Sequence, residues 1–201
     1  MDYYCWCVIL FKIFSNSLNR ELIKIIDIIN SLKYNNTMDN CLPLTKLKID
    51  HQSIHDTIER LSSPWHLAYI WDNDEEYHEL RINDWLDIKC VKNVAEQLPL
   101  DLSISSSRIV AEMLDKDFIL PAHKDGTRQA SIYIPLTALD CPLELYNENK
   151  IRTDDYYHDV ATLINAQSYH GTRTGSEAKL GLQFSLYEDY SILKERLSHL
   201  V

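Results

Sequence analysis

Hydrophobic residues recur with a helical period in the first half of the chain. Residues 18–33 are predicted to form a helix, because one face collects apolar side chains at steps of three and four: Leu18, Leu22, Ile25, Ile26 and Ile29. A second helical face collects His51, Ile54, His55 and Ile58. A short helix is predicted over residues 89–98, and it ends before Pro99. A final helix is expected over 191–201.

After residue 100 the hydrophobic positions alternate with polar ones, which is typical of β-strands. The expected strands lie at 102–104, 108–114, 118–125, 129–134, 143–146, 160–164 and 180–186. Asp, Asn, Pro and Gly separate these segments, and this pattern favours an antiparallel sandwich or barrel. The sequence has neither a Gly-rich phosphate loop nor a regular alternation of strands and helices, so Rossmann and P-loop folds are excluded.

The predicted organisation is one β-rich domain preceded by a separate N-terminal region. Residues 1–37 comprise an apolar segment and the first helix. Residues 38–201 are expected to fold as one domain with helical support over 38–99, a barrel over 100–190 and the C-terminal helix 191–201. A length of 201 residues fits a single domain with a sizeable core.

The apolar segment 3–14 does not have the features of a transmembrane helix or of a signal peptide. It is too short to span a bilayer, and Asp2 stands where a signal peptide carries positive charge. No stable membrane span is therefore expected. Met38 offers a second start, after which the chain becomes strongly acidic, so the functional chain is expected to need only residues from Met38 onward.

The net charge of −10 argues against broad binding to nucleic acid or to an anionic membrane, since both need a basic surface. A local basic site for a small anion remains compatible with it. The five cysteines are scattered and form no CxxC pair: Cys5, Cys7, Cys41, Cys90 and Cys141. They indicate neither a disulfide framework nor a zinc site, and a reducing, cytoplasmic location is expected.

Candidate metal ligands stand in the β-rich half. His123 and Asp125 point the same way if their segment is extended, because side chains of a strand alternate between faces. With His170 they make two imidazoles and one carboxylate, the facial triad of non-haem Fe(II) oxygenases. His158 is an alternative to His170, but it precedes a predicted strand where the distal ligand should follow one. The pair His51 and His55 lacks the glutamate that a zinc peptidase needs.

Four segments together resemble the Fe(II)- and 2-oxoglutarate-dependent oxygenases, and among them the aspartyl/asparaginyl β-hydroxylase-like group, which includes free-proline hydroxylases. They are Ile119-Leu-Pro-Ala-His-Lys-Asp125, Ala130-Ser-Ile-Tyr-Ile-Pro-Leu136, Leu163-Ile-Asn-Ala-Gln-Ser-Tyr-His170 and Lys179-Leu-Gly-Leu-Gln-Phe-Ser185. The resemblance implies a mainly β, double-stranded β-helix (a cupin-like jelly-roll) with N-terminal helices. It also implies Fe(II) on His123, Asp125 and His170, with 2-oxoglutarate and O₂ as cosubstrates.

The implied activity is that of a dioxygenase (a hydroxylase). The substrate would be a small amino-acid-like molecule, or an Asp, Asn or Pro side chain of a peptide, with succinate and CO₂ as co-products. Two alternatives remain open: a cupin-like metalloenzyme that does not use 2-oxoglutarate, and a non-catalytic jelly-roll binding protein. The sequence specifies neither the substrate nor the oligomeric state.

The last predicted strand carries the candidate cosubstrate anchor. Its apolar face holds Leu180, Leu182, Phe184 and Leu186, and its polar face, which should line the cavity, holds Lys179, Gly181, Gln183 and Ser185. The family usually places an arginine where this chain has Lys179, and a lysine binds a carboxylate as a point charge without the arginine fork. Arg173 and Arg128 are the other candidate cations, with Ser185 and Tyr133 as candidate neighbours of the cosubstrate.

Overall fold

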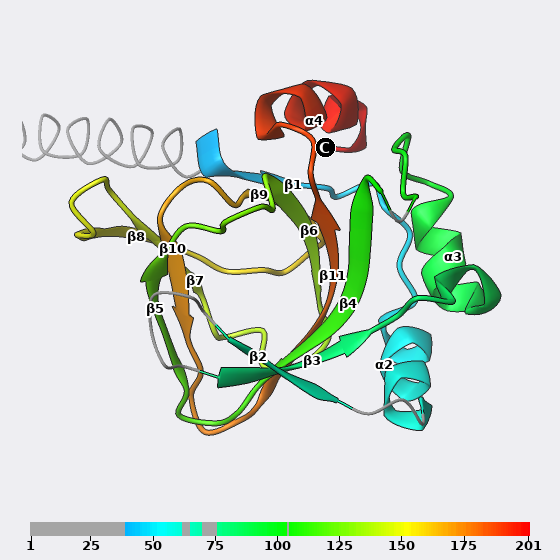
Figure 1. Cartoon of the computed structure of the whole chain (residues 1–201), viewed down its shortest axis with the longest axis horizontal. Helices are drawn as coiled ribbons and strands as arrows, with labels where there is room; N and C mark the ends of the chain where they lie inside the picture. The colour runs from blue at the N-terminus through cyan, green and yellow to red at the C-terminus, as the bar shows by residue number, and fades with distance from the viewer. Residues whose placement is uncertain (1–38, 62–64, 70–75, 104) are drawn as a thin grey trace, which may run out of the picture. The chain divides into compact units, whose positions relative to one another are not determined.

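The computed structural model describes residues 39–61, 65–69, 76–103 and 105–201 (Figure 1). The predicted helix 18–33 and the apolar segment 3–14 lie outside the described residues. Asn40–Val201 forms one compact unit. No helix in the described part of the chain is long and apolar enough to cross a membrane.

Two antiparallel sheets face each other and make a jelly-roll, the double-stranded β-helix expected from the sequence (Figure 1). The larger sheet has, in spatial order, β1 (Cys41–Pro43), β9 (Thr162–Asn165), β6 (Ala130–Pro135), β11 (Lys179–Leu186), β4 (Ser107–Leu114), β3 (Glu76–Arg81) and β2 (His66–Tyr69). The smaller sheet has β5 (Ile119–His123), β10 (His170–Arg173), β7 (Leu143–Tyr146) and β8 (Arg152–Tyr156).

The predicted helices after residue 50 are present. They are α2 (His51–Arg60), α3 (Lys89–Ala95) and α4 (Tyr190–Leu197), with short 3₁₀ turns at η1 (Trp85–Asp87) and η2 (Ser198–Leu200). The Asp50 carboxylate accepts the Ser53 N–H at 3.0 Å, which satisfies a free donor of the first turn and fixes where α2 begins. Helices α2 and α3 contact each other (Figure 1), and α2 buries Ile54 and Ile58.

Strand β11 lies at the centre of the larger sheet, between β6 and β4, and all of its residues are buried. Its apolar side includes Leu182 and Phe184, both fully buried in the core. On its other side Lys179 and Gln183 line the cavity between the two sheets. The alternation in the sequence predicted this division correctly, and it brings a lysine into the interior of the jelly-roll.

Five strands were not expected from the hydrophobic pattern. β1, β2 and β3 fall in the region 38–99, which was predicted to be helical support, so this prediction was too simple. β8 and β10 are short and polar, and their own propensity for strand is weak. They are strands because neighbouring strands supply their hydrogen-bond partners, a tertiary effect that the local sequence does not carry.

The predicted strand at 102–104 is not formed at its described residues. Leu102 and Ser103 belong to no strand. The Asp101 carboxylate accepts the Ser103 N–H at 2.9 Å and the Ser106 hydroxyl at 2.9 Å. These side-chain bonds fold the backbone into a turn before β4 begins.

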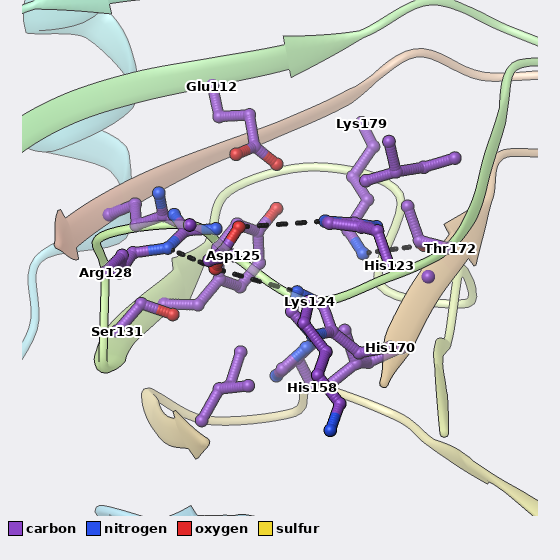
Figure 2. Close-up of a pocket in the computed structure, with 17 residues that line it drawn as sticks. Glu112, His123, Lys124, Asp125, Arg128, Ser131, His158, His170, Thr172 and Lys179 are labelled. Atoms are coloured by element: carbon purple, nitrogen blue, oxygen red, sulfur yellow. Dashed lines mark hydrogen bonds and ion pairs between the residues drawn. The ribbon is translucent and has the colours of Figure 1, made fainter. Parts of the chain in front are cut away.

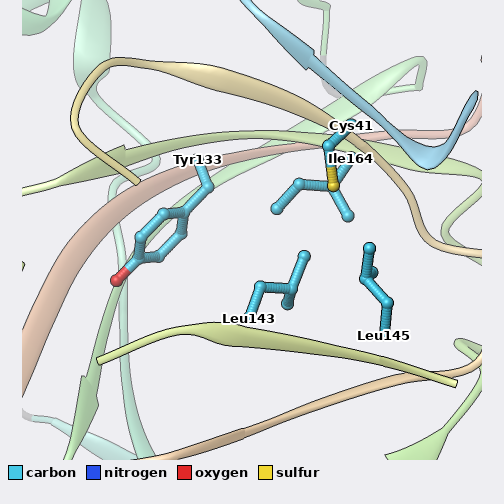
Figure 3. Close-up of a cluster of buried hydrophobic side chains, with 5 residues drawn as sticks. All are labelled: Cys41, Tyr133, Leu143, Leu145 and Ile164. Atoms are coloured by element: carbon cyan, nitrogen blue, oxygen red, sulfur yellow. The ribbon is translucent and has the colours of Figure 1, made fainter. Parts of the chain in front are cut away.

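A cluster of buried side chains fills one part of the space between the sheets (Figure 3). Its members are Cys41, Tyr133, Leu143, Leu145 and Ile164. They come from β1, β6, β7 and β9, so they connect the two sheets. Three of them, Tyr133, Leu143 and Ile164, also line the adjoining cavity and give it an apolar wall.

Gly171 is needed where β10 passes close to β5. A Cβ at this position would lie 2.5 Å from the Leu120 carbonyl oxygen and 3.2 Å from the Pro121 carbonyl. Both are backbone atoms that cannot rotate away. The register between the two strands also shifts between His170 and Thr172, so the close approach lies beside the His170–His123 pair.

We therefore predict that Gly171→Ala separates β5 from β10 and lowers the free energy of unfolding by about 1–3 kcal/mol. Gly175→Ala is the matched control, because a Cβ there meets no atom within 4 Å. Urea unfolding of both variants measures the difference. Equal stability of the two variants would show that the strands tolerate the side chain.

Candidate functional site

The two sheets enclose a cavity of about 270 Å³ (Figure 2). It is lined by polar groups from both sheets and from the loops beside them: Glu112, His123, Asp125, Arg128, Ser131, Tyr133, His158, His170, Thr172, Lys179 and Gln183. A buried cavity with converging polar groups is the usual form of a small-molecule site.

The structure brings His123, Asp125 and His170 together at this cavity (Figure 2). His123 ends β5 and pairs directly with His170, the first residue of β10, so their imidazole centroids lie 4.5 Å apart. Asp125 Oδ1 lies 3.8 Å from His123 Nε2, and Asp125 Oδ2 lies 3.9 Å from His170 Nε2. One atom of each residue is thus free to face a common point.

Backbone hydrogen bonds orient both imidazoles. His123 Nδ1 lies 2.9 Å from the Pro121 carbonyl oxygen, and His170 Nδ1 lies 2.8 Å from the Ser168 carbonyl oxygen. A carbonyl oxygen only accepts, so each Nδ1 carries a proton and each Nε2 lies on the side of the ring that faces Asp125. Burial, and then the nearby His123, lower the pKa of His170 to about 4, which keeps this ring neutral at ordinary pH.

The Arg128 guanidinium binds the Asp125 carboxylate, and the Gln167 amide binds the backbone beside it. Burial alone would raise the pKa of Asp125, but the Arg128 guanidinium, with Nε 2.6 Å from Oδ2, and then His170 reverse this and lower it. The Gln167 amide donates to the backbone oxygens of Asp125 at 3.0 Å and Arg128 at 2.6 Å. Asp125 is therefore held ionised, at a fixed position beside the two imidazoles.

This donor set fits a divalent transition metal. Two imidazole nitrogens and one carboxylate oxygen, from residues whose other polar atoms are already hydrogen-bonded, could hold an ion and leave coordination positions open. A second group of ligand-type atoms on α2 comprises His55, Asp56 and Glu59. It lies on the partly exposed surface of that helix, where acidic side chains commonly occur without an ion.

Lys179 reaches the same cavity from β11. Its side chain is 5% exposed, and Nζ donates to the Cys141 carbonyl oxygen and to Thr172 Oγ1, both at 3.3 Å. The ammonium also lies 5.2 Å from the centroid of the Tyr133 ring. Burial lowers the pKa of Lys179, and the nearby Glu112 opposes that shift. Lys179 is thus an interior lysine with its amine at the cavity wall.

The other candidate cosubstrate residues differ in position. Tyr133 and Arg128 line the cavity, although Arg128 is bound to Asp125. Arg173 lies outside it, with a side chain 59% exposed and Nε 4.0 Å from a Glu144 carboxylate oxygen. Ser185 is buried, but it accepts the Gln183 amide at 3.2 Å and does not line the cavity. Of these four candidates, Tyr133 and Arg128 thus lie in the cavity lining, and Arg173 and Ser185 do not.

Three residues that line or support the site were missed from the sequence: Glu112, Gln167 and Thr172. Strand alternation could have identified Glu112 as an inward residue of β4. The roles of Gln167 and Thr172 depend on contacts between distant segments, so no local signal marks them. The alternative ligand His158 lines the cavity, but it is not in the group of converging ligand atoms, which contains His170.

No protein-family model matches the sequence, and no curated protein matches it. Among solved structures, the chain is similar to the non-heme alpha-ketoglutarate-dependent epimerase SnoN from nogalamycin biosynthesis. The two sequences are 10% identical, and the TM-score is 0.52. The match covers 81% of this chain and 83% of that chain. It is also similar to a prolyl hydroxylase from Trichoplax adhaerens, with 14% identity, coverage of 83% and 92%, and a TM-score of 0.50. These similarities show that the chain shares the jelly-roll fold of the 2-oxoglutarate oxygenases.

We predict that alanine at His123, Asp125 or His170 abolishes stoichiometric binding of Fe(II) with little loss of folding, because each replacement removes one donor atom and leaves the core intact. Metal analysis after anaerobic loading, together with thermal unfolding, measures both effects. His55→Ala is the control, since it alters the surface group on α2. Stoichiometric iron together with intact activity in His170→Ala would contradict the assignment of His170 as a metal ligand.

Proposed function

We propose that the protein is an Fe(II)- and 2-oxoglutarate-dependent dioxygenase of the aspartyl/asparaginyl β-hydroxylase-like group. It hydroxylates a small amino-acid-like molecule, or an Asp, Asn or Pro side chain of a peptide, and releases succinate and CO₂. The observation that carries the proposal is the position of His123, Asp125 and His170 in one cavity with the buried Lys179. The fold shared with 2-oxoglutarate oxygenases supports it.

The chain's own residues provide binding and orientation. His123 Nε2, His170 Nε2 and one Asp125 oxygen would hold the ion, and the Pro121 and Ser168 carbonyls orient the two imidazoles. With 2-oxoglutarate and O₂, bound Fe(II) would supply the oxidising chemistry that removes a hydrogen from an unactivated carbon and returns a hydroxyl. The His123 and His170 side chains are buried, and the Asp125 side chain is 16% exposed.

Lys179 is the proposed anchor for the distal carboxylate of 2-oxoglutarate. Its bonds to Cys141 and Thr172 hold the ammonium at a fixed place in the wall. A buried charge is stable when it has a partner of opposite sign, and a carboxylate from the ligand supplies one. Leu143, Ile164 and the ring of Tyr133 lie in the same wall and suit the methylene groups of the cosubstrate.

Peptides are included among the substrates for one specific reason. The structure of the prolyl hydroxylase from Trichoplax adhaerens was determined in complex with a peptide fragment of the hypoxia inducible factor oxygen degradation domain. A free amino acid presents the same kind of side chain without the flanking backbone. Turnover of the matching free amino acid and of a peptide that contains it would distinguish the two classes.

The proposed reaction is tested by succinate release from 2-oxoglutarate with Fe(II) and O₂. Wild-type protein should form succinate, and His170→Ala should not. A cupin-like metalloenzyme of another kind would retain iron without forming succinate. A non-catalytic binding protein would bind no stoichiometric iron at all.

For the anchor, we predict that Lys179→Met raises the Michaelis constant for 2-oxoglutarate by about tenfold to a hundredfold, because a charge-assisted hydrogen bond is worth about 1.5–3 kcal/mol. Iron affinity should stay nearly constant. Lys179→Arg should be tolerated better than Lys179→Met, though incompletely, since the larger planar group needs room.

Arg173→Met is the control for the anchor, because this exposed side chain lies outside the cavity. It should leave the Michaelis constant for 2-oxoglutarate unchanged. The anchor is the wrong residue if Lys179→Met saturates like wild type while Arg128→Met or Arg173→Met does not.

We further propose that residues 1–37 are not needed for the chemistry. Every proposed site residue lies within the compact unit Asn40–Val201. A fragment that begins at Met38 should bind Fe(II) and convert 2-oxoglutarate at the rate of the full chain. A fragment that retains iron but cannot couple decarboxylation would contradict this proposal.

A further inference from the structure

The wall around Lys179 can satisfy only part of a bound carboxylate through the lysine itself. An ammonium group has three N–H donors. Two of them are engaged by the Cys141 carbonyl oxygen and Thr172 Oγ1, so one remains for a ligand. A carboxylate offers about four acceptor positions on its two oxygens. A second donor in this wall would therefore complete the hydrogen bonding of both oxygens.

His158 lines the same cavity, and its ring has a buried nitrogen without a hydrogen-bond partner in the described part of the chain. It lies in the segment between β8 and β9, its residue is 2% exposed, and its side chain lines the cavity (Figure 2). Nδ1 is buried, with no partner among the described residues. Buried polar side-chain atoms nearly always have a partner, and an unsatisfied one costs stability, so this imidazole points to a ligand that completes it.

Two tyrosines hold the imidazole in place. Its centroid lies 5.0 Å from the ring of Tyr133, over which the Lys179 ammonium also lies, and 5.2 Å from the ring of Tyr156. His158 and Lys179 therefore both lie near the same aromatic ring. Both side chains also line the same cavity, so a ligand group in this part of the cavity is accessible to both.

We propose that His158 is a cosubstrate-binding residue that donates a ring N–H to the distal carboxylate of 2-oxoglutarate, whose other contact is the Lys179 ammonium. This inference rests on the proposed function and adds a residue to it. Burial, and then the nearby Lys179, lower the pKa of His158 well below its usual range. A neutral imidazole gives the second donor without placing a second positive charge next to the lysine. Tyr133 lines the same cavity.

The test compares two 2-oxo acids that differ in the group His158 should contact. Calorimetric titration of the full chain loaded with Mn(II), without O₂, gives the dissociation constants for 2-oxoglutarate and for 2-oxopentanoate, which lacks the distal carboxylate. His158→Leu should weaken 2-oxoglutarate binding by about tenfold to a hundredfold, the effect of one hydrogen bond to a charged group. It should leave 2-oxopentanoate binding and Mn(II) affinity unchanged.

Two further variants separate hydrogen bonding from packing. His158→Gln keeps an N–H donor and should recover part of the affinity that His158→Leu loses, even if the leucine variant folds poorly. Tyr156→Phe preserves the ring beside His158 and should bind both acids like wild type. His158 and Lys179 are proposed to hold one carboxylate. The loss of binding free energy for 2-oxoglutarate in the double variant should therefore be smaller than the sum of the losses in His158→Leu and Lys179→Met.

Several results would overturn the inference. Unchanged 2-oxoglutarate affinity in both His158 variants removes His158 from the site and leaves the proposed function intact. Equal weakening for both acids assigns the residue to packing alone. If wild-type protein binds Mn(II) but neither acid, the proposed function fails and this inference fails with it.

Discussion

The pairing of β5 with β10 is the constraint on which the site depends. It places His123 and His170 directly opposite each other, at a centroid distance of 4.5 Å. Gly171 permits the close approach, because its position leaves no room for a Cβ beside the Leu120 carbonyl. Two backbone carbonyls then turn both Nε2 atoms toward Asp125. The geometry of the candidate metal centre is therefore set by backbone contacts, which are more rigid than contacts between side chains.

Charge is arranged in two separate places along the cavity. At one place the Asp125 carboxylate is paired with Arg128 and faces two imidazoles, and this donor set suits a divalent ion. At the other place the Lys179 ammonium is buried near Glu112 and bonded to a carbonyl and a hydroxyl, and its charge suits an anionic ligand. A dicarboxylate with one end at the ion and the other end at the lysine would fit both places, and 2-oxoglutarate has this form.

The sequence predicted the parts of the fold whose pattern is local. The strict alternation from Lys179 to Leu186 identified both faces of β11, and the His-x-Asp pair identified two converging ligands. It could not predict β10, whose four polar residues become a strand only through their neighbours. It also left Arg173 and Arg128 open as alternatives to Lys179, since only the folded sheets show that the lysine is interior and Arg173 exposed.

The most direct test of the central claim is a crystal structure of the full chain with Mn(II) and 2-oxoglutarate, obtained without O₂. The account predicts one ion bound by His123 Nε2, His170 Nε2 and an Asp125 oxygen, with the distal carboxylate of 2-oxoglutarate against Lys179 in the same cavity. An ion at another place, or 2-oxoglutarate bound outside this cavity, would contradict it.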